Sequence, residues 1–292
     1  MRSNNSDMLK KVFVGFKLKD TQGKELDPGK CSIEEIYAAV VEGPAYRDFT
    51  SRTIKGLKKE NVLVALQWLE AELKKYFEDA EKDKDDFDEW HKNTCREFCK
   101  RFSNCCGKEI ADGKAQKIVN MSFKYLFCIG ATKQYPVDKF KYCHMPLDAY
   151  TLDWFADKVV DGWYNEGKNR KEKIHLSKIR ENPWSNLEYG DPDTPYSYAW
   201  IQQTIRKYLN SDSNEIYREK DNTPLTPFAA EFYIWPERQW KLAVKNLLGQ
   251  AVLKDPLNPQ DGYPAYCAEE LEKDYCAIEE KLKGHKFRQK EQ

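Results

Sequence analysis

The amino-acid sequence predicts an all-α protein, a multi-helix domain over residues 31–292 preceded by a short extended N-terminal arm over residues 1–30. Apolar residues recur at helical spacing through most of the chain, and we find no internal repeat and no regular alternation of strands with helices. The chain has 292 residues, of which 40% are hydrophobic, with 8 Trp, 17 Tyr and 14 Phe. A chain of this length and composition can bury a sizeable core.

Local signals predict the individual elements. Residues 12–18 alternate loosely between apolar and polar types and lead into turn-forming residues, which favours an extended arm. Ser32 and Glu35 have the spacing of a capping box and begin a helix that ends at Gly43-Pro44. Apolar periodicity predicts further helices over residues 55–80, 87–102, 198–209, 226–235 and 265–282, with a loop rich in proline and aromatic residues at 180–198.

The stretch 113–155 is the centre of the predicted domain, and it contains two helices. The first is apolar enough to be buried on most sides, yet it carries Lys117 in its opening turn and Lys124 seven residues later on the same face, with Asn120 between them. The second follows a Pro-Leu-Asp triplet, in which Asp148 is the N-cap, and should end near residue 162 or 167. The sequence thus provides a lysine at the start of one helix and an aspartate at the start of the next.

This pattern resembles the helix-hairpin-helix DNA glycosylase superfamily, and within it the archaeal 8-oxoguanine glycosylases. In that branch a lysine opens an apolar helix, a second lysine follows seven residues later, and a Pro-x-Asp helix start comes about thirty residues after the first. Here Asp148 comes 31 residues after Lys117. The usual Gly-x-Gly hairpin is reduced to Gly113 alone. The resemblance implies a DNA glycosylase, with or without AP-lyase activity, that excises a damaged or modified base from double-stranded DNA without a cofactor, at a site flanked by two helical lobes.

The chemistry of base excision gives these residues roles. An amine that attacks the sugar C1′ forms a Schiff base, and a carboxylate supports the cationic sugar. A first-turn position near the positive end of the helix dipole, together with burial, disfavours an ammonium ion, and this favours Lys117 as nucleophile, with Lys124 as the alternative. The backbone amides at a helix N-cap keep Asp148 ionised and oriented. Because an asparagine also caps helices, we expect Asp148→Asn to cost only about 1 kcal/mol in stability.

Contacts to the DNA are predicted from position and charge. The basic run at 168–173 follows the helix that Asp148 begins and is the strongest candidate for a phosphate-contacting patch. His144 lies four residues before Asp148 and could line the pocket or could simply cap or pack. The predicted substrate-binding residues are Gly113, Lys114, Asn120, His144, Lys168, Arg170 and Lys171.

Charge and motifs limit the other functions. Forty-eight basic and 48 acidic residues give no net charge, so DNA binding would depend on a local patch. The chain lacks a P-loop, a Gly-rich dinucleotide loop, HExxH and G-x-S-x-G, which argues against nucleotide hydrolysis, zinc proteolysis and the common serine hydrolases. We find no signal peptide and no membrane-spanning stretch, and expect a cytoplasmic protein.

The nine cysteines raise the question of a metal site. His91, Cys95 and Cys99 follow at four-residue spacing on one helix, so a zinc or iron–sulfur site is conceivable. Helical thiols at this spacing are more often packed side chains of a reducing compartment, and we expect reduced cysteines without metal.

A second function class stays open. The chain would then be a non-catalytic helical protein, regulatory or complex-forming, that keeps a glycosylase-like fold. The zero net charge and the missing second hairpin glycine favour this alternative, whereas the pairing of Lys117 with Asp148 favours the enzyme.

Overall fold

The computed structural model describes residues 24–27, 30–50, 57–79, 83–128, 137–219, 221–235 and 237–238. The all-α prediction is confirmed, because these ranges contain helices and no strand beyond isolated bridging pairs such as Arg218 with Pro224. Within the same ranges, no helix combines the length and the apolar character that crossing a bilayer requires. The helix predicted over residues 265–282 lies outside the described residues, as does the predicted arm apart from 24–27 and Lys30.

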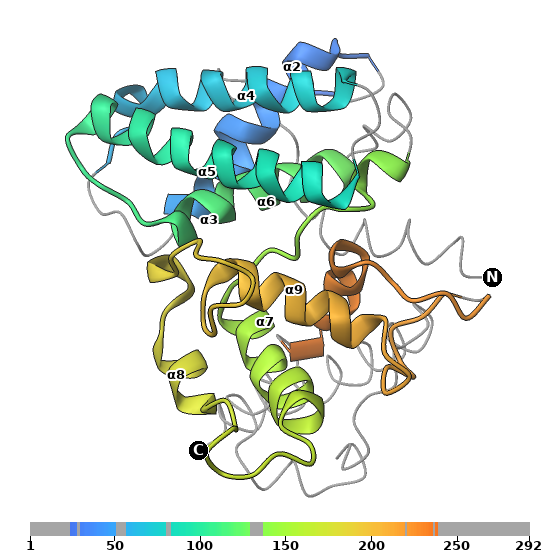
Figure 1. Ribbon diagram of the computed structural model, residues 1–292. Coiled ribbons are helices and arrows are strands. Elements are labelled where there is room, and N and C mark those ends of the chain that lie inside the picture. Colours follow the sequence, from blue (N-terminus) through green and yellow to red (C-terminus); the bar gives the residue numbers. More distant parts are fainter. Residues whose placement is uncertain are drawn as a thin grey trace, which may run out of the picture.

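The helices form two groups, one above the other in Figure 1. The first group is built around a core of aromatic rings. Phe49 meets Phe98 and Phe102 edge to face at centroid distances of 5.7 and 5.5 Å, a geometry worth about 0.5–1.5 kcal/mol per pair beyond burial. The group contains α2 (Ile33–Val40), η1 (Val41–Ala45), α3 (Tyr46–Thr50), η2 (Lys59–Val62), α4 (Leu63–Glu78), α5 (Lys84–Cys106) and α6 (Asp112–Cys128).

The second group packs around Trp154, which is fully buried and donates its indole N–H to the Tyr217 hydroxyl at 3.0 Å. Residues 227–235 are also helical and lie beside the end of α6, in orange in Figure 1. The group contains α7 (Ala149–Trp154), η5 (Phe155–Tyr164), α8 (Leu176–Glu181), η6 (Trp184–Asn186) and α9 (Tyr198–Leu209).

Several of the predicted helix signals are confirmed by the structure. Ser32 and Glu35 make both hydrogen bonds of a capping box, at 3.2 and 2.7 Å. Gly43 leaves helical geometry with φ −99° and ψ −106°, and the chain kinks there before α3. Asp148 caps α7, which continues as η5 to Tyr164, between the two expected ends near residues 162 and 167.

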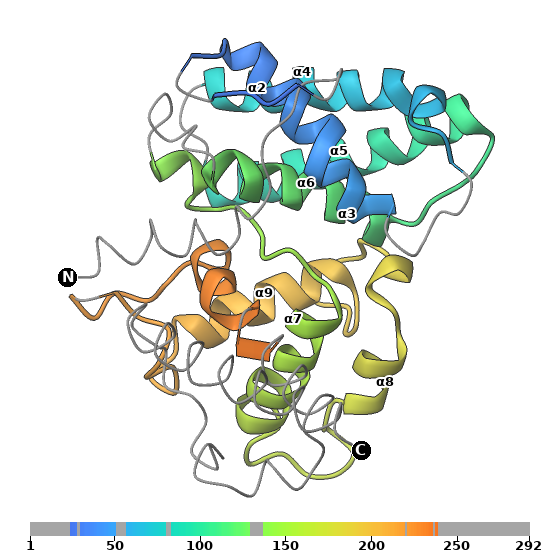
Figure 2. The same cartoon turned by 180° about the vertical axis from the view of Figure 1, so that it is seen from behind.

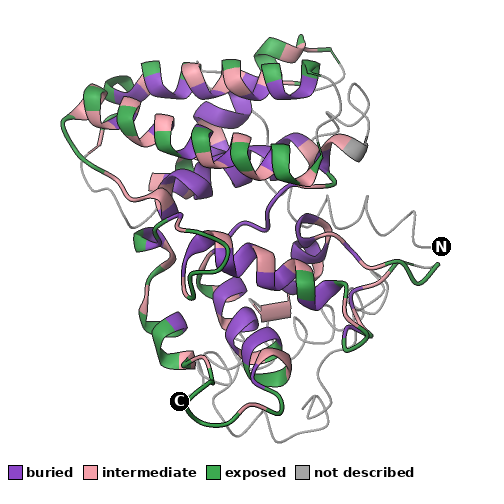
Figure 3. Ribbon diagram, viewed as in Figure 1, coloured by how far each residue is buried: buried purple, intermediate pink, exposed green. Residues whose placement is uncertain are grey.

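A short segment without regular structure, residues 143–147, joins the two groups. It runs from the upper group to α7 and is seen from both sides in Figures 1 and 2. All five residues are buried, as the purple colour in Figure 3 shows. We call residues 142–148 the crossing segment, since it carries Asp148 from one group of helices to the other.

The predicted start of one helix is wrong, because α6 begins at Asp112 and not near Lys117. Asp112 accepts the backbone N–H of Tyr189 at 2.9 Å, and Gly113 donates its N–H to the Leu187 oxygen at 2.8 Å. Through these two contacts a distant loop holds the first two residues of the helix, and the local sequence does not reveal this. Lys117 therefore lies in the second turn, where the positive end of the helix dipole acts only weakly.

Gly113 is also needed for the approach of η6 to α6. A Cβ atom at this position would stand 2.0 Å from the Trp184 oxygen and 3.0 Å from the Leu187 nitrogen, both of them backbone atoms. The two elements can therefore lie this close only because residue 113 has no side chain.

We expect Gly113→Ala to destabilise the fold by about 1–3 kcal/mol or more, because the backbone of η6 must move away. The free energy of unfolding in urea measures this loss. Gly162→Ala is the matched control, since its Cβ would meet nothing closer than the Asp157 oxygen at 3.4 Å. It should change stability by no more than about 1 kcal/mol, in the stabilising direction for a helical glycine. Equal stability of the two variants would contradict the close approach.

Candidate active site

The predicted pair of Lys117 and Asp148 meets at the boundary between the two groups of helices. Lys117 Nζ donates to Asp148 Oδ2 at 3.1 Å, and the two side chains are only 8% and 16% exposed. The other oxygen, Oδ1, accepts the backbone N–H groups of Tyr150 and Thr151 at 3.0 and 3.1 Å. One carboxylate therefore caps α7 with one oxygen and holds the lysine with the other.

Trp235 completes the environment of this carboxylate. Its indole N–H donates to Asp148 Oδ2 at 2.8 Å, so this oxygen accepts two donors from two different elements. Burial raises the pKa of Asp148, but Lys117, the Thr151 amide and the Trp235 indole together outweigh it and lower the pKa below its usual value. Asp148 is therefore an oriented anion at neutral pH.

Lys124 has a carboxylate partner of its own. Its Nζ lies 2.7 Å from Glu231 Oε1, and the two side chains are 4% and 2% exposed. The same ammonium lies 5.4 Å from the centre of the Trp235 ring and 5.5 Å from that of Phe232, distances at which a cation is attracted to an aromatic face. Trp235 thus touches both pairs and connects Lys124 with Asp148.

The second oxygen of Glu231 is left without a partner. Oε2 is buried and makes no hydrogen bond in the described part of the chain. Burial raises the pKa of Glu231, and the nearby Asp148 adds to this effect, while Lys124 opposes it. A buried acceptor without a donor is costly, so Oε2 is available to an N–H or O–H group of a bound molecule.

Glu231 is not among the predicted site residues, although the sequence carries a signal for it. For the aromatic residues around 184–200 and 232–235, Trp235 among them, the sequence leaves open both stacking on a flipped base and packing in the core. Glu231 is the single charge in the apolar run FAAEFYIW, and a carboxylate in such a run needs a buried cation. Trp235 follows four residues later, so the two side chains lie on one helix face. The Trp184 ring lies 5.7 Å from Lys117 Nζ, so each of the two lysines has an aromatic ring beside it.

Asn120 and His144 lie in a second polar cluster, not in the site around Lys117. Asn120 donates to Gln116 Oε1 and to the Tyr198 hydroxyl, both at 2.9 Å, and accepts from His91 Nε2 at 2.9 Å. His144 makes hydrogen bonds to Tyr198 at 2.9 Å and to Asp88 at 2.7 Å. Both residues are buried and their polar atoms have partners within the protein, which for His144 agrees with the alternative that it packs; the substrate-binding role of the two residues stays a prediction.

The histidines of this second cluster are neutral. Burial lowers the pKa of His144 to about 4, with Arg206 acting in the same direction and Asp88 against it. Burial and the neighbouring His144 lower the pKa of His91 well below its usual value. In the neutral state each ring has one donor and one acceptor nitrogen, which matches the partners that surround it.

The remaining predicted contacts lie apart from the lysines or are already engaged. The Gly113 N–H donates to the Leu187 oxygen at 2.8 Å within the protein. Lys114 is partly buried, and burial lowers its pKa. Lys168 Nζ lies 3.3 Å from the centre of the Tyr164 ring, while Arg170 and Lys171 are exposed. The helix from Ala149 to Tyr164 separates this basic turn from Asp148 by about 20 Å.

The cysteine cluster on α5 does not converge on one point. Cys95 Sγ lies 3.7 Å from His91 Nδ1, whereas Cys99 Sγ faces Asp112 Oδ1 at 4.0 Å. Both ring nitrogens of His91 have other partners, namely Tyr189 and Asn120. Across the residues that the structure describes, no group of three or more His, Cys, Asp or Glu side chains is placed to hold a metal ion.

We expect Lys124→Met to cost about 3–5 kcal/mol of stability, because it leaves Glu231 buried without its cation. The double variant Lys124→Met with Glu231→Leu should recover most of this loss, since an apolar pair fills the same space. Lys75→Met is the matched control: Lys75 lies at the same 2.7 Å from Glu72 but is 64% exposed, so its removal should cost less than about 1 kcal/mol. Urea denaturation of the four proteins gives the comparison. A double variant less stable than Lys124→Met would contradict the assigned burial.

The geometry around Asp148 raises the loss of stability expected for Asp148→Asn above the loss expected from the helix cap alone. Its amide group would turn an N–H₂ towards the Lys117 ammonium and the Trp235 indole, both donors, so we expect a loss of about 2–4 kcal/mol at pH 7. The folded pKa of Asp148 is lowered. The contribution of the Asp148 carboxylate to folding stability is therefore complete above its unfolded pKa of about 3.9, and it is lost as the pH falls through its lower pKa in the folded state. The difference between wild type and variant should shrink below about pH 4; a constant difference from pH 7 to pH 3 would refute the ion pair.

Comparisons with known proteins do not assign this chain to a family. No family model, no curated protein and no solved structure matches the chain. A proposal about function therefore depends on the arrangement of Lys117, Lys124, Asp148, Glu231 and Trp235 described above.

Proposed function

We propose that this protein is a DNA glycosylase that excises a damaged or modified base from double-stranded DNA, with Lys117 as nucleophile and Asp148 as the catalytic carboxylate. One observation carries the proposal: an amine and a carboxylate, far apart in sequence, meet at 3.1 Å in a site that largely excludes water. This is the pair of groups that base excision through a Schiff base requires.

The geometry supports a sequence of steps in which the atoms balance. The Lys117 ammonium gives one proton to Asp148 Oδ2, the acceptor 3.1 Å away, and its lone pair then attacks the sugar C1′. The N–C1′ bond forms as the bond to the base breaks, and the base leaves with the bonding electrons. It takes the proton from Asp148, whose restored charge supports the cationic sugar. The nitrogen now bonded to C1′ carries the positive charge; when the bond from C1′ to the ring oxygen breaks, one of its protons passes to that oxygen, and the protonated Schiff base remains, from which strand cleavage can follow.

The choice of Lys117 over Lys124 follows from their partners. Lys117 faces Asp148, the carboxylate that caps α7. One oxygen of this carboxylate is held by a backbone amide of α7, and the other accepts the lysine. Lys124 lies two turns further along α6, about 10 Å away along the axis, and is held between Glu231 and two aromatic rings. Its position suits recognition of a base better than attack on a sugar.

The orphaned oxygen of Glu231 supports the same division of roles. A base taken out of the helix stacks on aromatic rings and is recognised by hydrogen bonds to its edge. Trp235 offers an aromatic face next to Lys124, a donor, and Glu231 Oε2, an unsatisfied acceptor. The aromatic and polar groups that such a base needs thus occur within one cluster.

A non-catalytic helical protein is the second candidate, and specific observations favour it. Both lysines are buried in ion pairs, and the Gly113 N–H that could bind a phosphate is used by Leu187. The exposed basic turn at 168–173 is remote from Asp148. In this case the charged pairs would only fix how the two groups of helices sit against each other.

Incubation of the protein with duplexes that carry a panel of lesions and modified bases, with borohydride present, separates the two candidates. We expect wild type to form a trapped covalent adduct, Lys117→Gln to form none, and Lys124→Gln to retain trapping because it keeps the nucleophile. Asp148→Asn should lose base excision. Circular dichroism of each variant controls for folding.

Two results would contradict the assignment in different ways. Trapping by Lys117→Gln but not by Lys124→Gln would exchange the roles of the lysines. Absence of both trapping and base release by wild type on every duplex would reject the glycosylase and leave the non-catalytic protein.

A further inference from the structure

We propose that Gln202 of α9 is a positioning residue that sets Asp148 against Lys117 by clamping the crossing segment. The inference rests on the proposed function for its catalytic consequence, but the clamp itself is a statement about the fold. Residues 143–147 are buried and form no helix or strand, so their backbone groups need partners from elsewhere.

Gln202 supplies those partners at the middle of the segment. Its Nε2 donates to the Met145 oxygen at 2.7 Å, and its Oε1 accepts the Met145 N–H at 3.2 Å. A single amide side chain thus pairs with both backbone groups of one residue, as a neighbouring strand would. Gln202 is 1% exposed, so no water replaces either hydrogen bond at low cost.

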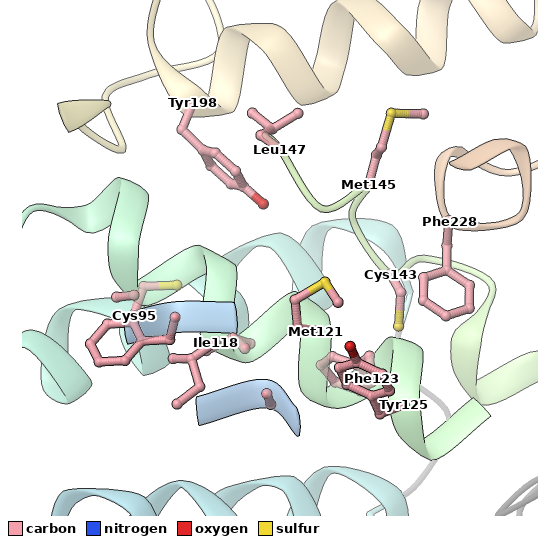
Figure 4. Close-up of a cluster of buried hydrophobic side chains, with 14 of the residues drawn as sticks. Cys95, Ile118, Met121, Phe123, Tyr125, Cys143, Met145, Leu147, Tyr198 and Phe228 are labelled. Carbon is pink, nitrogen blue, oxygen red and sulfur yellow. The ribbon is translucent and has the colours of Figure 1, made fainter. Parts of the chain in front are cut away.

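The same face of α9 makes further contacts to the crossing segment. Tyr198 and Arg206 lie four residues before and after Gln202, and therefore on the same side of the helix. Tyr198 makes a hydrogen bond to His144 at 2.9 Å, and Arg206 donates to the Tyr142 oxygen at 3.2 Å. Figure 4 shows Tyr198 pointing from its helix towards the α6 side of the core, with Leu147 and then Met145 following along the crossing segment in this view.

Contacts from α6 and α7 fix the end of the segment. Gln116, the residue before Lys117, donates to the Leu147 oxygen at 3.4 Å, and Thr151 donates to the Pro146 oxygen at 3.1 Å. Asp148 is the next residue after Leu147, three residues from the Gln202 clamp. A shift of the segment at Met145 is therefore transmitted to Asp148 over at most about 10 Å of extended chain.

The catalytic consequence follows from the sensitivity of such sites to geometry. A displacement of about 1 Å in a reacting group can cost about 100-fold in rate. Without the clamp, Asp148 would keep its cap on α7 but change its distance to Lys117 and Trp235. Gln202 touches neither the lysine nor the carboxylate, so its role is to position and not to react.

Gln202→Met tests the proposal, because methionine fills a similar volume without either hydrogen bond. Gln202→Glu is the second variant: it keeps the acceptor for the Met145 N–H but loses the donor, and it serves if the first variant does not fold. Asn214→Leu is the matched control. Asn214 is also buried and makes three hydrogen bonds to backbone groups, of Leu209 and Tyr217, outside the crossing segment.

Two measurements are made on each variant. The first is the ¹H–¹⁵N resonance of the Trp235 indole, assigned by its loss in Trp235→Phe, because this N–H donates to Asp148 and reports its position without any activity. The second is the single-turnover rate of base excision, beside the affinity for a duplex that carries an uncleavable abasic analogue. We expect Gln202→Met to displace the indole resonance and to slow excision by about 10- to 100-fold, with less than about a threefold change in affinity.

The outcomes separate this inference from the proposed function. Asn214→Leu should leave both the indole resonance and the rate near those of wild type even where its loss of stability equals that of Gln202→Met. If Gln202→Met leaves both unchanged, or Asn214→Leu changes them equally, the positioning role is overturned. If wild type excises no base, the proposed function fails, and the indole resonance alone decides: a displaced resonance supports the clamp and an unchanged one rejects it.

Discussion

The burial of two ammonium groups on one helix is the constraint on which the rest of the structure depends. Nearly every residue of α6 is buried, and Lys117 and Lys124 are among them. An ammonium ion removed from water without a partner costs several kcal/mol, so each lysine requires a carboxylate from another element. The crossing segment and α7 deliver Asp148, and the helix at 227–235 delivers Glu231. The contact between the two groups of helices is thus specified by charge as well as by apolar packing.

Asp148 shows how one residue serves two requirements at the same time. Its Oδ1 satisfies two amides at the start of α7, and its Oδ2 accepts Lys117 and Trp235. The cap fixes the carboxylate to the second group of helices, while the ion pair fixes it to the first. A shift of the segment at Met145 therefore moves the capping carboxylate relative to Lys117, which is why the clamp by Gln202 has consequences beyond its own two hydrogen bonds.

The sequence predicts those features that depend on local chemistry. The capping box at Ser32, the cap at Asp148 and the bounds of α9 follow from residue type and periodicity, and the pairing of Lys117 with Asp148 follows from a resemblance in spacing. The start of α6 is not predictable in this way, because Asp112 and Gly113 are satisfied by Tyr189 and Leu187 from a loop more than seventy residues away. The hydrogen bonds of His144 are likewise not predictable, because its partners come from α5 and α9.

The cost of the buried charges bears on the choice between an enzyme and a non-catalytic protein. An ion pair inside a protein is often no more stabilising than apolar side chains of the same volume, and sometimes less so. If the two pairs only joined the groups of helices, well-packed apolar residues would do so at least as well. The second cluster at the same boundary, around Asn120 and His144, has its polar atoms satisfied, as expected for a structural network. The cluster around Glu231 instead leaves Oε2 unsatisfied beside Lys124 and Trp235. Five other buried side-chain atoms in the described residues also lack a hydrogen-bond partner, but Glu231 Oε2 lies beside a buried cation and an aromatic ring. An unsatisfied acceptor in such surroundings is what a site awaiting a ligand would show, and it favours the enzyme over a purely structural role.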